Sequence, residues 1–162
     1  MKINLFAVLS AMLFVTPCKK DDAVTPAPST VVSFTKTTVT GSQFAPLFEH
    51  QSVVFNSKLW VIGGRKTNTV YSNEIWSGTD GSSWSQTSTV GPVFSTRSGH
   101  QVVVFNNKLW VIGGLDNGSA LNDIWNSTDG TTWTQVTANA AFGIRSLHEV
   151  IVFNNKMWLI GG

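Results

Sequence analysis

Three apolar stretches of similar sequence dominate the hydrophobic pattern of this chain. Each begins with His, continues through an apolar run and a turn containing Asn, and ends with Trp, two aliphatic residues and Gly-Gly. They occupy His50–Gly64, His100–Gly114 and His148–Gly162, so their first residues are 50 and 48 residues apart. A constant period of this size is typical of proteins in which one supersecondary unit is stacked or repeated around an axis.

The second unit predicts four antiparallel strands, at Gln101–Phe105, Lys108–Ile112, Leu121–Asn126 and Thr132–Val136. The first is a continuous apolar run, as expected of a strand buried on both faces. Asn106-Asn107 predicts a tight hairpin, because Asn tolerates positive φ. Gly113-Gly114 is expected to end the second strand, and Asp129-Gly130 to turn the chain into the fourth.

Further residues recur with the same period, and together they resemble the kelch repeat. The marks of that family are a double Gly at the end of the second strand, two spaced aromatic residues, and an Arg ahead of the next unit. Here they are Gly63-Gly64, Trp76, Trp84 and Arg97, followed by Gly113-Gly114, Trp125, Trp133 and Arg145. The resemblance extends over residues 31–162. It implies an all-β fold in which each unit is one four-stranded blade of a β-propeller.

The start of the repeat region predicts one additional strand. Phe34 precedes His50 by 16 residues, as Trp84 precedes His100. Val31–Val39 is therefore expected to be an orphan outer strand. The chain would then hold an incomplete kelch-type propeller with one orphan strand, two full blades and half of a third. Since propellers have about 4–8 blades, we expect a piece of a longer protein, with assembly from several copies as the alternative.

The N-terminal residues predict export and lipid anchoring. Met1–Val15 carries one Lys and a short apolar run, which suits a secretory signal and is too short to span a membrane. Cys18, the only cysteine, follows where a bacterial lipobox would place its lipidated residue. We therefore expect a signal peptide at 1–17, a lipidated Cys with a Pro/Thr/Ser-rich tether at 18–30, and the partial propeller at 31–162.

Lys19-Lys20-Asp21-Asp22 follows Cys18 and resembles the export tag of surface lipoproteins in Bacteroidetes-type bacteria. The expected location is the bacterial outer membrane, lipid-anchored and surface-exposed. If Cys18 is incidental to an ordinary signal peptide, the protein is periplasmic or secreted instead.

Composition and charge narrow the function classes. Charged residues make up 12% of the chain, and 11 Lys and Arg against 9 Asp and Glu give a net charge of +2. No basic run or basic face is evident, so nucleic acid is not an expected partner.

Three histidines at equivalent positions, His50, His100 and His148, raise the question of a metal site. Each lies at the start of an apolar strand that recurs together with all its neighbours. A structural role is expected, such as a hydrogen bond between adjacent blades. Zinc and copper sites normally mix ligands at short defined spacings, so neither a metal nor another cofactor is predicted.

Candidate ligand-binding residues lie in two sets of loops. The resemblance implies that the loops before the first strand and after the second strand share one face of the propeller, where ligands usually bind. The candidates there are Arg65, Asn68, Arg97, Asp116, Asn117 and Arg145. The planar guanidinium of Arg suits carboxylate or hydroxyl-rich ligands. The alternative for Arg97 and Arg145 is hydrogen bonding to backbone carbonyls between blades.

No arrangement of nucleophile, base or paired carboxylates is visible in the sequence. We therefore expect a cell-surface binding module for a protein or glycan ligand, without catalysis of its own. The alternative is a fragment of a propeller enzyme acting on carbohydrate, of the galactose-oxidase-like or sialic-acid-processing kind. A third possibility is a structural spacer or adhesin scaffold.

Overall fold

The structure is a computed structural model, and it describes residues 35–162. Residues 38–162 form one compact unit, which contains all the described strands. The strands are β1 Gln51–Phe55, β2 Lys58–Arg65, β3 Tyr71–Gly78, β4 Ser85–Gln86, β5 Gln101–Phe105, β6 Lys108–Asp116, β7 Ser119–Ser127, β8 Thr134–Thr137, β9 Glu149–Phe153 and β10 Lys156–Ile160. Cys18 and the predicted signal peptide and tether lie outside the described residues. Among residues 35–162, no helix is long and apolar enough to cross a membrane.

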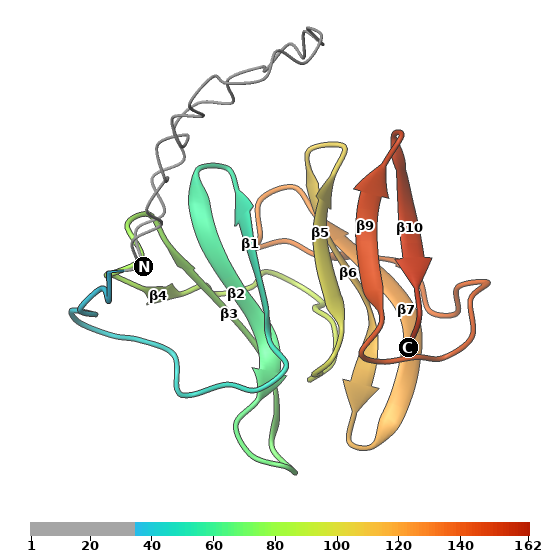
Figure 1. The fold of residues 1–162 in the computed structure, drawn as a ribbon, viewed down its shortest axis with the longest axis horizontal. Coiled ribbons are helices and arrows are strands. Elements are labelled where there is room, and N and C mark those ends of the chain that lie inside the picture. The colour runs from blue at the N-terminus through green and yellow to red at the C-terminus, as the bar shows by residue number, and fades with distance from the viewer. Residues whose placement is uncertain (1–34) are drawn as a thin grey trace, which may run out of the picture. The chain divides into compact units, whose positions relative to one another are not determined.

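The strands form two four-stranded antiparallel sheets and one two-stranded sheet, which confirms the predicted all-β architecture. We call β1–β4 blade 1, β5–β8 blade 2 and the β9–β10 hairpin blade 3. In both complete blades the strands pair in chain order. The first strands β1, β5 and β9 lie side by side, so the blades are arranged radially around them (Figure 1).

The hairpins between first and second strands form as the sequence predicts. Asn106 and Asn107 have φ of 48° and 56°, the conformation of a two-residue hairpin turn. The indole Nε1 of Trp110 donates to the Phe105 carbonyl at 2.9 Å, which holds the hairpin closed. The equivalent bond from Trp60 reaches Phe55 at 2.9 Å in blade 1. A shared local sequence therefore gives the same hairpin in successive blades.

The prediction that Gly-Gly ends the second strand is wrong. Both β2 and β6 continue past the glycines, with a register shift between Ile112 and Gly114 in blade 2. Gly113 and Gly114 have φ of 56° and 111°, in the left-handed region that favours glycine. The pair is therefore a β-bulge inside a longer strand, and this bulge brings the backbone close to a neighbouring histidine.

The core joins blades 1 and 2. Trp60 and Ile62 of β2 are 3% and 0% exposed, and Leu109 and Val111 of β6 are both 0% exposed. They belong to one buried cluster. This burial confirms that Trp60 is a core residue, as its recurrence suggests. The predicted burial of both faces of the first strand is wrong for β9, where four of five residues are exposed.

Two further predictions differ from the structure: the orphan strand and the tight hairpins at Asp-Gly. Residues 35–39 form no strand, and residues 31–34 lie outside the described residues. The predicted orphan strand is therefore absent from its described half. The Asp-Gly turns are not two-residue hairpins, because β7 ends at Ser127 and β8 begins at Thr134.

An aspartate carboxylate organises each of these longer turns. Asp129 Oδ1 accepts hydrogen bonds from the backbone N–H groups of Thr131 and Thr132 at 2.7 and 2.8 Å. Burial acts to raise the pKa of Asp129, but these hydrogen bonds outweigh it and lower the pKa to about 2. Asp80 is bonded in the same way by Ser83 and Ser82, which lowers its pKa to about 2.

Candidate functional site

Arg97, one of the predicted ligand-binding residues, has a side chain that is 0% exposed. Its guanidinium forms a two-pronged ion pair with Asp123, with both N–O distances 2.8 Å. Nη1 also donates to the Gly113 carbonyl at 2.9 Å. Burial acts to raise the pKa of Asp123, but the hydrogen bond and charge of Arg97 lower it overall. Arg97 is therefore a buried structural cation of blade 2.

The backbone of Arg97 bonds to the preceding blade. Its N–H donates to the Ser72 carbonyl at 3.0 Å, and its carbonyl accepts from the Gly64 N–H at 2.8 Å. Since the side chain bonds to blade 2, this residue links two blades. Arg145 repeats the pattern, because its N–H donates to Leu121 at 3.0 Å and its Nη1 to the Gly161 carbonyl at 2.9 Å. For both arginines the alternative reading, hydrogen bonding to carbonyls between blades, describes the geometry.

In blade 1 the equivalent acidic residue is paired with a lysine, whereas blade 2 uses an arginine. Leu47 stands where the other units have Arg, and Glu74 stands where blade 2 has Asp123. Glu74 accepts from Lys66 Nζ at 2.5 Å and from Trp76 Nε1 at 3.1 Å. The loop lysine thus replaces the missing arginine. The sequence signal was available, since the acidic residue precedes Ile-Trp in both blades.

The equivalent histidines connect blades by packing. His100 is fully buried, and neither ring nitrogen makes a hydrogen bond. Its ring lies against the bulge of blade 1: a Cβ on Gly63 would be 2.7 Å from His100 Cε1. His148 stands in the same relation to Gly113, at 3.0 Å. The expected structural role fits this geometry, since each ring packs against the bulge of the preceding blade and interacts with its backbone, at Ile62 for His100 and at Ile112 for His148.

Burial gives His100 a pH-dependent effect on stability. Burial first, and the nearby charge of Arg97 second, lower its pKa to about 3, with the backbone of Ile62 acting in the opposite direction. The unfolded imidazole titrates near pKa ~6.5. Between these values the unfolded state binds a proton that the folded state does not, so stability falls as the pH is lowered.

We expect urea unfolding to show lower stability at pH 5 than at pH 7. The slope should approach about 1.4 kcal/mol per pH unit for a histidine that stays neutral in the folded state. His100→Gln should reduce this slope. Part of the slope should remain in this variant, because the pKa of His148 is also lowered, first by burial and then by the charge of Arg145. A slope unchanged by His100→Gln would contradict the assignment.

The remaining predicted ligand residues lie at the loop end, where β2 and β6 finish. Arg65 donates to Glu49 Oε1 at 2.6 Å and is half-buried. Asp116 accepts from Thr96 Oγ1 at 2.7 Å. Asn68 and Asn117 are exposed at the tips of their loops, and Asn117 has φ of 49° in a two-residue turn. Of these four residues, Arg65 and Asp116 are hydrogen-bonded to neighbouring side chains. The side chains of Asn68 and Asn117, at the loop tips, have no such partner among the described residues.

A chain of backbone bonds runs across the blades where the first strands begin. Gly99 N–H donates to the Glu49 carbonyl at 3.0 Å, and Leu147 N–H donates to the Gly99 carbonyl at 2.7 Å. All three residues have positive φ, of 53° at Glu49, 57° at Gly99 and 56° at Leu147. Positive φ is unfavourable for Glu and Leu, and such strain is enriched at functional sites.

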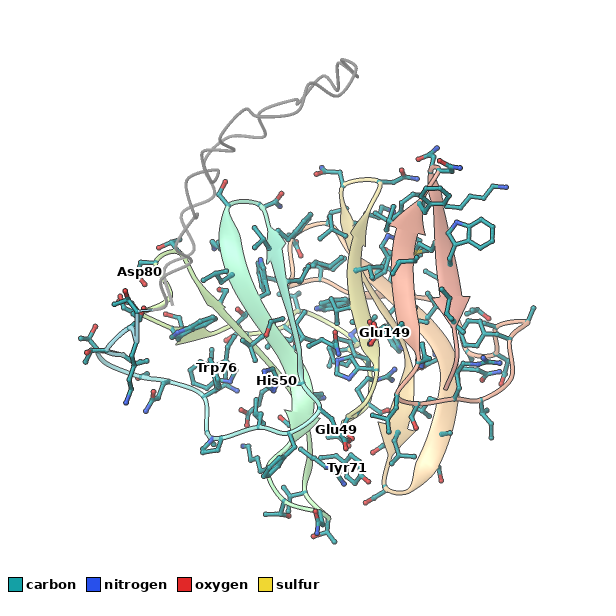
Figure 2. The ribbon with its side chains drawn as sticks, viewed as in Figure 1. Glu49, His50, Tyr71, Trp76, Asp80 and Glu149 are labelled. Atoms are coloured by element: carbon teal, nitrogen blue, oxygen red, sulfur yellow. The ribbon has the colours of Figure 1, made fainter. Side chains whose placement is uncertain are left out.

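This backbone surrounds a hollow of about 140 Å³, which we call the axial hollow. Its lining comes from all three blades: Glu49, Gln51, Gly99, Gln101, Leu147, His148 and Glu149. Figure 2 labels Glu49 and Glu149, which lie next to the starts of β1 and β9. The sequence pattern did not identify Glu49 or Glu149 as site residues. The available signal was a polar first residue in each of three largely apolar strands, at Gln51, Gln101 and Glu149.

The acidic residues of the axial hollow differ in their partners. Glu49 is satisfied, because its Oε1 accepts from Arg65 and its Oε2 from Ser98 Oγ at 2.8 Å. Glu149 forms no ion pair within the described part of the chain. Among residues 35–162, no group of three or more His, Cys, Asp or Glu side chains is placed to hold a metal ion.

A second hollow, of about 530 Å³, lies beside β4 and includes Trp76 and Trp84 in its lining. The edge of Phe44 packs against both rings, with centroid distances of 6.2 and 5.1 Å. These rings therefore contribute to packing, which agrees with the predicted core role of the recurrent Trp residues.

Comparison with known families adds to this geometry. Residues 24–162 match the KLHDC2/KLHL20/DRC7 Kelch-repeats domain. Comparison with curated proteins found no match. The family match covers most of the chain and agrees with the repeated blades, the Gly-Gly bulges and the recurrent Trp residues. The chain therefore belongs to the kelch-repeat family.

Proposed function

We propose that this chain is a cell-surface binding module that presents the loop end of its blades to a protein or glycan ligand, without catalysis of its own. Kelch domains are generally binding modules. The observation that carries the proposal is the axial hollow, where polar side chains from three blades meet without hydrogen-bonding one another. Such groups are available to a ligand.

The loops that follow β2 and β6 support the same proposal. The loop Lys66–Val70 connects β2 to β3, and the Lys66 N–H donates a hydrogen bond to the Val70 carbonyl at 2.8 Å. The equivalent connection in blade 2 is the two-residue turn Asn117-Gly118. Different loops on a constant scaffold are the usual origin of binding specificity.

The cellular setting is proposed from the sequence. Cys18 would carry the lipid, and residues 18–30 would hold the blades away from an outer membrane. The periplasm or the medium is the alternative location. Metabolic labelling with a fatty-acid analogue tests this proposal, because Cys18→Ser should abolish labelling if Cys18 is the lipidated residue.

Ligand screening with paired variants tests the binding function. The full chain would be screened against panels of peptides and glycans. Asn68→Ala combined with Asn117→Gly should weaken a selected ligand at least tenfold, because both side chains are lost from the loop end. Glycine retains the positive φ of Asn117. Lys156→Ala, at the opposite end of β10, is the control and should leave binding unchanged. Equal binding by all three proteins would contradict a loop-end site.

A further inference from the structure

We propose that the axial hollow binds a cationic hydrogen-bond donor, the ammonium or guanidinium group of a basic side chain in a peptide ligand, through Gln51, Gln101 and Glu149. This inference rests on the proposed binding function and names its ligand class. The three residues are the first residues of β1, β5 and β9, so the repeat brings one polar side chain from each blade to the same hollow.

Gln101 is the strongest indication of a ligand. It is only 8% exposed, and its side-chain amide has no hydrogen-bond partner in the described part of the chain. The amide is not one of the fully buried polar atoms that lack a partner, so it remains accessible from the hollow. Buried polar groups in folded proteins are nearly always satisfied by protein, water or ligand. Because Gln101 lines the axial hollow, a ligand there can supply the missing partner.

The charge around the hollow favours a cation. Arg65 neutralises Glu49, whereas Glu149 has no ion-pair partner among the described residues. Arg145 forms no ion pair with Glu149, and its guanidinium donates to the carbonyls of Gly143 and Gly161. Burial keeps His148 neutral by lowering its pKa. One unpaired carboxylate and two carboxamides therefore line the hollow, and a charge-assisted hydrogen bond from a cation to the carboxylate is of the stronger kind.

The size and rim of the hollow favour a side chain over a sugar. Its volume of about 140 Å³ is below the ~300–1,000 Å³ of pockets that enclose a whole small molecule. Leu147, 68% exposed, lies over Gly99 at the rim. It offers an apolar surface for the methylene stem of a lysine or arginine.

Titration with capped tripeptides tests the inference. The probes are acetyl-Ala-Arg-Ala-amide, acetyl-Ala-Lys-Ala-amide and the neutral citrulline analogue, followed by NMR chemical shifts of the full chain at low ionic strength. We expect at least one basic peptide to bind, and citrulline to bind at least tenfold more weakly. The preferred basic peptide identifies guanidinium or ammonium as the bound group. No binding of either basic peptide, or equal binding of citrulline, would overturn the inference.

Variants locate the site. Glu149→Gln, at an exposed position, and Gln101→Leu should each weaken the preferred peptide at least tenfold. Asp80→Asn removes the same charge in the turn after β3, outside the lining of the hollow, and should change binding less than twofold. Unfolding curves establish that each variant is folded. Unchanged affinity in Glu149→Gln would overturn the inference even if Gln101→Leu fails to fold.

The two proposals can fail separately. If the basic peptides do not bind, but Asn68→Ala/Asn117→Gly still loses a ligand found by screening, the cationic site is wrong and the binding function stands. If neither effect is seen, both proposals fail.

Discussion

Replacing Arg97 with methionine should lower the free energy of unfolding by about 3–5 kcal/mol, because it leaves a partly buried carboxylate without its cation. Arg97 is 0% exposed, and both prongs of its guanidinium reach Asp123 at 2.8 Å. Methionine fills much of the volume and supplies no charge. In the variant, Asp123 would retain only the Trp125 indole N–H, at 2.8 Å, as a side-chain donor.

Matched variants separate the charge effect from lost packing. Arg145→Met removes the equivalent arginine, which is half-buried and whose side chain donates to two carbonyls without an ion pair. It should cost about 1 kcal/mol or less. Arg97→Met combined with Asp123→Asn should recover at least ~1 kcal/mol relative to Arg97→Met alone, because no buried charge remains unpaired. Urea unfolding of the four proteins measures each value.

The dependence of stability on pH in the acidic range gives an independent test of the ion pair between Arg97 and Asp123. The pKa of Asp123 is lowered in the folded protein, so its contribution to stability is present above the unfolded pKa of ~3.9 and is lost as the pH falls through the folded value. Arg97→Met removes the opposing charge, and burial then raises that pKa. In Arg97→Met, the fall in stability that Asp123 causes at acidic pH should therefore be absent. An equal cost for Arg97→Met and Arg145→Met, with unchanged acid dependence, would contradict the assigned role.

The repeat made the blades predictable from sequence. Hairpin turns depend on residues next to one another, and Asn106-Asn107 is sufficient to specify one. The predicted first strand Gln101–Phe105 has the bounds of β5. The second strand was cut short at Gly113-Gly114, because a glycine pair is equally consistent with a strand end and a bulge. Only the neighbouring His148 ring shows why a bulge is needed there.

The candidate site was less predictable, because its chemistry depends on residues distant in sequence. Arg97 was expected to meet a ligand, but its partner Asp123 comes from the third strand of the same blade. A loop arginine and a buried arginine look alike until that pairing is known. Gln101 was missed for a related reason, since its neighbours in the hollow come from other blades.

Replacing Gly130 with alanine should lower the free energy of unfolding by about 2–5 kcal/mol. Gly130 has φ of 80°, where a non-glycine residue costs about 1–2 kcal/mol. A Cβ there would also overlap the indole ring of Trp60, which is 3% exposed and belongs to the preceding blade. Overpacking of a core costs about 1–3 kcal/mol more. The predicted loss combines both effects.

Gly81 is a matched control at the same position of blade 1. Its φ of 73° is similar, but the nearest atom to an added Cβ is Leu59 Cδ1 at 3.6 Å, an ordinary contact. Gly81→Ala should therefore cost only the backbone term, about 1–2 kcal/mol. The difference between the two alanine variants in urea unfolding measures the contact of Trp60 with the next blade. If the two variants are equally destabilised, that contact contributes nothing to the folded state. If Gly130→Ala is the more destabilised, the Asp-Gly turn is a point at which adjacent blades hold each other in place.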